Sequence, residues 1–256
     1  MKALKKIGIL VLAIALVLTF AACAGGNSGK QKLKMATAAA FPPYEFKEGD
    51  SFAGIDIEIA QKLAEKLDME LEINDVEFGS IIGGIESGKF DVGIAGMSVT
   101  EDRLKSVNFS NSYATGVQVV IVKEDSTITS IDDIIDQGAT IGVEQDTTGD
   151  IYCSDTIENG GFGEDKVVRY KTGNDAVVAL QAGKVDCVII DNEPAKSYVA
   201  DSAGLKILDT EYVEEEYAIA MNKNATELLD KINKALDEMK ADGTMNAIIS
   251  KYIKAD

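Results

Sequence analysis

From residue 33 onward, the chain alternates between strand-like and helix-like patterns of hydrophobic residues. Strand-like runs fall at 33–38, 70–76 and 90–96, and helix-like runs fall at 56–67 and 80–88. The first helix carries apolar residues at a helical spacing, at Ile59, Ala60, Leu63, Ala64 and Leu67. This order of segments predicts α/β layers with largely parallel strands.

Two segments of the chain are similar to each other at a constant offset of 95 residues. IESGKFDVGIAG (85–96) and LQAGKVDCVIID (180–191) each contain a helix end, a Gly-Lys-x-Asp step and an apolar strand. The repeat predicts two lobes built on one plan, with Gly96 and Asp191 at equivalent carboxyl ends of strands. Ligands bind at that edge of open α/β sheets, so two such edges facing each other would form a cleft.

The first 22 residues predict an export signal. Lys2, Lys5 and Lys6 precede the apolar run IGILVLAIALVLTFAA, which ends before Cys23. A membrane-spanning helix is the alternative, but the run is short for one. FAAC has the look of a bacterial lipobox, with Phe20 where leucine is usual. We therefore expect residues 23–32 to be a lipidated Cys23 and a flexible tether on the outer face of the cytoplasmic membrane.

The charge balance excludes nucleic acid as a partner. The net charge is −18, and it becomes −21 without the leader, which carries three lysines and no acidic residue. Such a surface repels nucleic acid and anionic lipid. The chain has no histidine and no clustered cysteines, so no metal or other cofactor is expected. Cys153 and Cys187 could form a disulfide in an exported protein or be buried thiols, and the sequence leaves both open.

The segment AGMSVTEDR (95–103) places a cation at the start of a predicted helix. Thr100 is suited to cap this helix, and the helix dipole makes Arg103 mildly unfavourable there. Arg103 and Arg169 are the only arginines in the chain. A surface ion pair with a neighbouring acid is one interpretation. The other is recognition of a ligand carboxylate, for which a guanidinium has the matching planar geometry.

Other candidate groups follow predicted strands. The loop GVEQDTTGD (142–150) is a turn or a carboxylate contact through Thr147 or Thr148, and its acidic residues argue against phosphate. Asp191 is either a helix cap or an acceptor for a ligand ammonium group. Phe41 and Phe78 lie after strands and form either core or pocket wall. Arginine for a carboxylate, aspartate for an ammonium group and aromatic walls together indicate an α-amino acid ligand.

The chain resembles bacterial solute-binding protein family 3, the amino-acid receptors of ATP-binding-cassette importers. The similarity covers about residues 33–253 and rests on motifs in one order: ATAAAFPPYEF, GIDIEIAQKLAEKL, IAGMSVTEDR, NFSNSY, GVEQDTTGD, VDCVIIDNEPA and DGTMNAIISKYI. The resemblance implies a two-lobed periplasmic-binding-protein clamp of type II, each lobe a mostly parallel sheet flanked by helices. Lobe 1 would be 33–114 plus 217–256 and lobe 2 would be 118–213, with hinges near 113–117 and 213–217.

The resemblance also assigns ligand-binding roles. Arg103 would bind the α-carboxylate with Gly96 and Ser98, and Asp191 would bind the α-ammonium group. The remaining assigned positions are Thr147, Thr148 and Gly149 in the opposing loop, Phe41 and Phe78 as walls, and Ala38, Glu144 and Gln145 near the ligand side chain. Ala38 stands where several cation- and glutamine-binding relatives have aspartate, which argues against a lysine- or arginine-like ligand. Asp146 replaces a common glycine.

The function implied is an exported, monomeric receptor that delivers an L-amino acid to an importer by closing its cleft. A sensing module for a signalling receptor would use the same binding chemistry. A dehydratase-type enzyme on this clamp would need a general acid or base, for which Asp191 and Glu144 are the obvious candidates. We expect no catalysis, and the sequence leaves the identity of the amino acid open.

Overall fold

The computed structural model describes residues 29–210 and 212–254. The expected signal peptide, Cys23 and the tether up to residue 28 lie outside these residues. Within them, no helix combines the length and the apolar composition that crossing a bilayer requires.

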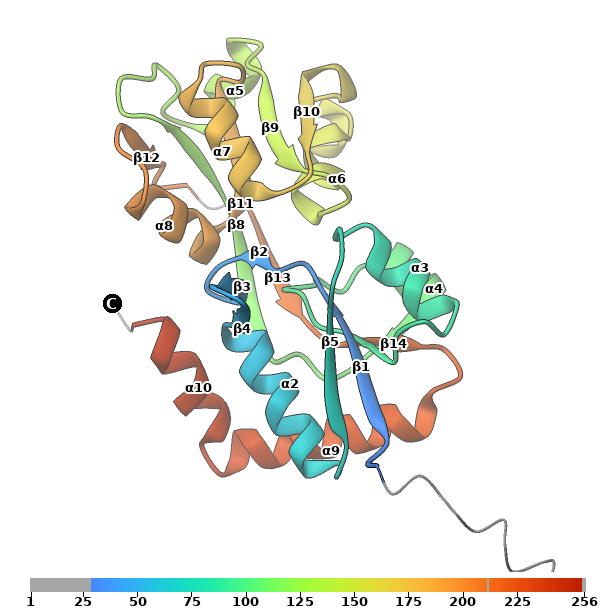
Figure 1. Ribbon diagram of the computed structural model, residues 1–256. Helices are drawn as coiled ribbons and strands as arrows, with labels where there is room; N and C mark the ends of the chain where they lie inside the picture. The colour runs from blue at the N-terminus through green and yellow to red at the C-terminus, as the bar shows by residue number, and fades with distance from the viewer. Residues whose placement is uncertain (1–28, 211, 255–256) are drawn as a thin grey trace, which may run out of the picture. The chain divides into compact units, whose positions relative to one another are not determined.

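The first lobe is built on a five-stranded sheet (Figure 1). Its strand order is β5 (Glu70–Asp75), β1 (Lys32–Thr37), β6 (Val92–Gly93), β14 (Ala220–Asn222) and β7 (Val107–Phe109). β1 pairs in parallel with β5 and β6, whereas β14 is antiparallel to both of its neighbours. One strand therefore runs against four others, so the expected mostly parallel direction is confirmed.

The helices of this lobe are α2 (Ile55–Lys66), α3 (Ser80–Glu86), α4 (Glu101–Ser106), α9 (Thr226–Ala241) and α10 (Thr244–Tyr252). The helical pattern read at 56–67 is confirmed in α2, where Ile59 and Leu63 are fully inaccessible to solvent. Each such aliphatic side chain contributes about 1.5–3 kcal/mol of hydrophobic stabilisation. α2 packs against α9 and α10, which close this side of the lobe.

The second lobe has the sheet order β10 (Val167–Tyr170), β9 (Ile141–Glu144), β11 (Cys187–Asp191), β8 (Ala114–Lys123) and β12 (Leu205–Ile207), and β13 (Val213–Tyr217) also pairs with β8. β8 is antiparallel to β11, β12 and β13, while β9 is parallel to β10 and β11. The repeat is visible here, because β11 pairs in parallel with β9 as β6 pairs with β1.

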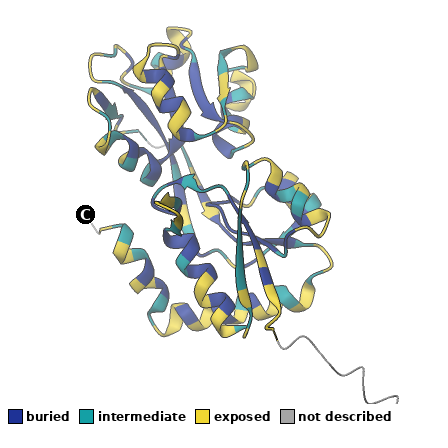
Figure 2. Ribbon diagram, viewed as in Figure 1, coloured by how far each residue is buried: buried dark blue, intermediate teal, exposed yellow. Residues whose placement is uncertain are grey.

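The helices of the second lobe are α5 (Ile131–Asp136), α6 (Thr148–Ser154), α7 (Gly173–Gln181) and α8 (Asn192–Ala200), with 3-10 turns η1 (Ile157–Asn159) and η2 (Glu164–Lys166). Buried residues follow the strands of both lobes, and exposed residues lie on the outer helix faces (Figure 2). Cys153 and Cys187 are buried free thiols in the core of this lobe, which decides between the two interpretations of the cysteine pair.

Two segments carry the chain between the sheets. β8 follows β7 of the first sheet, and β13 precedes β14 on the return. The two strands pair antiparallel from Ala114 opposite Tyr217 to Gln118 opposite Val213. The two-lobed α/β clamp is thus the observed fold, while the hinge positions near 113–117 and 213–217 stay a prediction.

A small antiparallel sheet connects the first lobe to the site. It consists of β2 (Ala40–Phe41), β3 (Glu45–Glu48) and β4 (Ser51–Ala53). The turn between β2 and β3 contains the cis peptide bond Pro42–Pro43. This turn buries both Phe41 and Glu45, so an aromatic ring and a carboxyl group reach the interior from one hairpin.

Candidate functional site

A cavity lies between the two lobes. Its walls come from both lobes and consist of Ala38, Phe41, Glu45, Phe78, Ala95, Gly96, Ser98, Arg103, Glu144, Thr147, Thr148 and Asp191. One cationic and three acidic side chains thus share a largely enclosed space.

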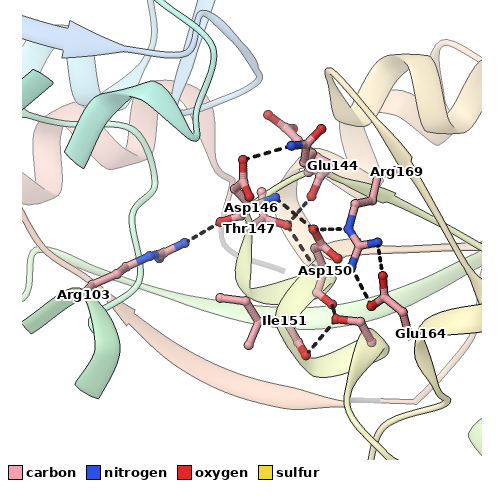
Figure 3. Close-up of polar contacts among 10 residues, drawn as sticks. Arg103, Glu144, Asp146, Thr147, Asp150, Ile151, Glu164 and Arg169 are labelled. Atoms are coloured by element: carbon pink, nitrogen blue, oxygen red, sulfur yellow. Dashed lines mark hydrogen bonds and ion pairs between the residues drawn. The ribbon is translucent and has the colours of Figure 1, made fainter. Parts of the chain in front are cut away.

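Arg103 is buried, with 7% of its surface exposed, and lies in the first turn of α4. Thr100 caps the helix as expected, since its hydroxyl accepts a hydrogen bond from the Arg103 N–H at 3.2 Å. The guanidinium donates to the Ser98 carbonyl at 2.8 Å and to the Asp146 carbonyl at 3.0 Å. The surface ion pair with a neighbouring acid is wrong, because Asp102 pairs with Lys105 and Arg103 points across the cleft (Figure 3).

The ring of Phe78 lies against the Arg103 guanidinium, 5.2 Å from the ring centroid to the central carbon. A cation over an aromatic face is attracted by the ring's electron density. Burial lowers the pKa of Arg103, but guanidinium groups stay protonated in proteins. Phe78 therefore both lines the cavity and fixes the arginine, a role that the sequence did not indicate.

The loop before α6 is held in an unusual conformation. Asp146 has a φ of 65°, in the left-handed region where glycine is common and aspartate is tolerated. Its N–H donates to the Asp150 carboxylate at 3.0 Å, and that carboxylate also accepts a bond from Arg169 at 2.9 Å (Figure 3). The second arginine of the chain thus supports the loop whose carbonyl meets Arg103.

Thr147 and Thr148 both line the cavity, but their hydroxyl groups have different hydrogen-bond partners. Thr147 caps α6, with its hydroxyl accepting from the Asp150 N–H at 3.3 Å and donating to the Glu144 carbonyl at 2.8 Å. Thr148 is buried and its hydroxyl donates to Glu215 at 2.9 Å.

Asp191 ends β11 and is buried. Asp191 occupies the N-cap position of α8, as one interpretation predicted, but its side chain makes no capping hydrogen bond there. It accepts hydrogen bonds from the Tyr217 hydroxyl and from the Gln118 amide, the latter at 2.9 Å. Burial, followed by the charge of Glu215, raises its pKa to about 7. Such a carboxyl group gains from a cation placed beside it.

Glu144 ends β9 and is also buried. One carboxylate oxygen accepts the Gly173 N–H at 2.9 Å. Burial raises its pKa to about 7, against the lowering effect of that hydrogen bond.

Glu45 is a cavity residue that sequence reasoning missed. It is 1% exposed, and its pKa is raised well above the ordinary value, first by burial and then by the charge of Asp56. Asp56 accepts the Gly96 N–H at 2.8 Å and the Tyr113 hydroxyl at 2.9 Å, and burial raises its pKa to about 6. A proton on Glu45 would bond to Asp56. The only available signal was a charge placed between the two aromatic residues of PYEF.

Glu215 was missed as well. It lies on β13 as the middle residue of three consecutive glutamates, and strand alternation buries it while Glu214 and Glu216 are exposed. It accepts bonds from Ser98, Gln118 and Thr148. Nothing in the sequence distinguished it from its two neighbours.

Ten of the twelve ligand-binding positions expected from the sequence line the cavity. Gly96 has a φ of 49°, and a Cβ there would come within 2.9 Å of the Phe41 ring, so glycine is required. Gln145 is exposed, and Gly149 lies behind the wall, near the Gln118 side chain. No group of three His, Cys, Asp or Glu side chains in the described part of the chain is arranged to hold a metal ion.

Comparison with known proteins places these observations in a family. Residues 33–255 match the family described as bacterial extracellular solute-binding proteins, family 3. The arginine-binding extracellular protein ArtP of Bacillus subtilis (strain 168) is 35% identical, over 96% of this chain and 98% of the relative. The ABC transporter arginine-binding protein 1 of Escherichia coli (strain K12) is 30% identical, over 89% and 93%.

A solved structure agrees with this match. An ancestral arginine-binding protein bound to arginine superposes with a TM-score of 0.80 at 38% identity, over 88% of this chain and 99% of the other. All three similar proteins carry the names of binding proteins.

Proposed function

Because this chain belongs to the bacterial extracellular solute-binding proteins of family 3, we propose that it binds a cationic amino acid, with L-arginine the first candidate, and delivers it to an ATP-binding-cassette importer. The observation that carries the proposal is the composition of the cavity, which combines Arg103 with Glu45, Glu144 and Asp191. A ligand with one carboxylate and two cationic groups complements that set of charges.

Each end of such a ligand has a partner. Arg103 offers a buried guanidinium to the α-carboxylate, beside the hydroxyls of Ser98 and Thr148. Asp191 accepts the α-ammonium group. The raised pKa of Asp191 reflects a buried carboxyl group that costs free energy to ionise, and a ligand cation offsets this cost.

The cationic side chain is assigned to Glu144 and Glu45. The absence of an aspartate at position 38 had argued against a cationic side chain. These two glutamates supply carboxyl groups to the same cavity from β9 and from the β2–β3 hairpin. The names of the relatives support the same ligand class. We therefore assign Ala38, Phe41 and Phe78 to the apolar wall along the ligand.

Closure of the cleft is part of the proposal. Contacts between the lobes include an ion pair of Lys171 with Glu77 at 2.7 Å and a hydrogen bond from Tyr198 to the Ala40 carbonyl. We propose that the lobes separate about β8 and β13, near 113–117 and 213–217, and that the ligand favours the closed form by contacting both lobes. Small-angle scattering should give a smaller radius of gyration with arginine than without it.

The way in which the protein is held at the membrane is proposed from the leader alone. We infer lipidation of Cys23 and a monomeric receptor on the outer face of the cytoplasmic membrane. Mass spectrometry of the amino-terminal peptide from native cells tests the lipid, and sedimentation velocity tests the monomer. An unmodified terminus or a stable dimer would contradict these two points.

Calorimetric titration with L-arginine and L-citrulline tests the ligand class. Citrulline has nearly the same shape and lacks the positive charge of the side chain. We expect arginine to bind at least about tenfold more tightly, since a buried charge-assisted hydrogen bond contributes roughly 1.5–3 kcal/mol. Arg103→Ala should abolish binding of both. Equal binding of the two ligands would refute the cationic assignment, and binding of no amino acid would refute the receptor assignment.

A further inference from the structure

Glu215 is a buried carboxylate that is not among the residues lining the cavity and that the proposed ligand contacts do not use. Its Oε2 atom accepts hydrogen bonds from Ser98 Oγ at 3.1 Å, Gln118 Nε2 at 3.0 Å and Thr148 Oγ1 at 2.9 Å. Ser98 follows β6 of the first lobe, whereas Thr148 begins α6 of the second. A single oxygen atom thus receives one hydroxyl group from each lobe.

Ser98 and Thr148 also line the cavity, as Arg103 does. A serine or threonine hydroxyl carries one proton and can donate one strong hydrogen bond. While both donate to Glu215, neither can donate to a carboxylate of a bound ligand. Glu215 also acts on Arg103, because among the surrounding charges it opposes most strongly the lowering of the Arg103 pKa by burial.

We propose that Glu215 is a specificity-determining residue that competes with the ligand carboxylate for the hydroxyl groups of Ser98 and Thr148, and that its bonds to both lobes raise the share of the closed form in the ligand-free protein, which the ligand raises further. The inference rests on the proposed function, because it assumes a ligand carboxylate at Arg103. To bind the ligand carboxylate, the hydroxyl groups of Ser98 and Thr148 must give up Glu215 as their hydrogen-bond acceptor. The gain from the carboxylate is reduced by the bonds that Glu215 loses.

The test compares L-arginine with agmatine, which has the same guanidinium and amine but no carboxylate. Glu215→Gln keeps the shape of the side chain and removes its charge. Glu216→Gln is the matched control, since Glu216 is the next residue of β13 and is exposed. The affinity ratio of arginine to agmatine is measured by titration calorimetry for the purified protein and both variants.

We expect this ratio to rise about tenfold in Glu215→Gln and to stay unchanged in Glu216→Gln. A hydrogen bond to a charged acceptor is worth roughly 1.4 kcal/mol more than one to a neutral acceptor. Loss of the Glu215 charge also weakens attraction for the cationic groups that both ligands share, and this part cancels in the ratio, whereas relief of the repulsion between Glu215 and the arginine carboxylate adds to the rise. A generally damaged cleft would leave the ratio unchanged.

An unchanged or lower ratio in Glu215→Gln overturns the inference while leaving the receptor assignment intact. If Glu215→Gln does not fold by circular dichroism, Glu215→Asp replaces it, because it withdraws the carboxylate by one methylene group and should raise the ratio less strongly. If neither ligand binds the unmodified protein, the proposed function fails. The bonds of Glu215 to both lobes are then tested alone by small-angle scattering without ligand. An unchanged radius of gyration in Glu215→Gln overturns the inference, and an increase supports it.

Discussion

Replacement of Glu144 by glutamine is expected to stabilise the ligand-free protein at alkaline pH. Glu144 is buried and its pKa rises from an ordinary 4.5 to about 7. The folded protein therefore binds a proton more tightly at this position than the unfolded chain does. Stability must fall as the pH rises through the window between these two values, because the unfolded state ionises first.

The magnitude follows from the two pKa values. A pKa difference of one between the folded and unfolded states corresponds to about 1.36 kcal/mol. The rise of about 2.5 in the pKa of Glu144 therefore lowers the free energy of unfolding by about 3 kcal/mol at pH 8 and by about 1 kcal/mol at pH 5. Glutamine removes this cost and, like the protonated carboxyl group, keeps a neutral acceptor for the Gly173 N–H, whose bond to the carboxylate is already included in the pKa. The gain should be about 3 kcal/mol at pH 8 and about 1 kcal/mol at pH 5.

Urea denaturation of the ligand-free protein at both pH values measures the effect, provided that the slope of unfolding free energy against urea is unchanged. Glu158→Gln, at an exposed position of the same lobe, is the control and should have no effect at either pH. Glu144→Gln, unlike the control, should also lose most of the preference for arginine over citrulline. A Glu144→Gln protein that is less stable than the original at pH 8, or equally altered at both pH values, would refute the reasoning.

Three further substitutions test other parts of the site. Arg103→Lys keeps the charge but cannot reproduce both carbonyl contacts, so the affinity for L-arginine measured by calorimetry should fall about 10- to 100-fold. A loss below about threefold would contradict the argument that the planar guanidinium is needed at this position. Thr147→Ala removes the cap of α6 and should cost about 1 kcal/mol of unfolding free energy in urea, with Thr147→Ser restoring most of it; equal stability of all three would show that the cap is unimportant. Gly116→Ala would place a Cβ 2.3 Å from the Tyr217 hydroxyl and 2.6 Å from the Asp191 carboxylate, so thermal unfolding should reveal a loss of about 1–3 kcal/mol; a neutral result would mean that these side chains move freely.

Sequence reasoning succeeded where a residue conflicted with its local environment. Arg103 was identified because a cation at a helix start is unfavourable, and the structure buries it beside the cavity. The internal repeat related β6 and β11 because the Gly-Lys-x-Asp step precedes each strand. The helix α2 followed directly from the spacing of its apolar residues.

Sequence reasoning failed where the role depends on contacts between distant segments. Glu45 reaches the cavity only because the β2–β3 hairpin turns back, and its high pKa depends on Asp56. Glu215 is distinguished from two identical neighbours only by the face of β13 that points inward. Gln118 gains its importance from donating to both Asp191 and Glu215, which lie 73 and 97 residues away in the chain.

The tyrosine residues around the cleft should allow ligand binding to be followed by the intrinsic fluorescence of the protein. The chain contains eight tyrosines and no tryptophan, so its intrinsic emission comes from phenol groups alone. Tyr44 packs edge to face on Tyr217 with ring centroids 5.1 Å apart, and Tyr217 and Tyr113 each donate a hydrogen bond to a buried carboxylate. Carboxylates that accept a phenol proton quench tyrosine fluorescence. A cation that engages Asp191 would therefore change the emission of the protein without any attached dye.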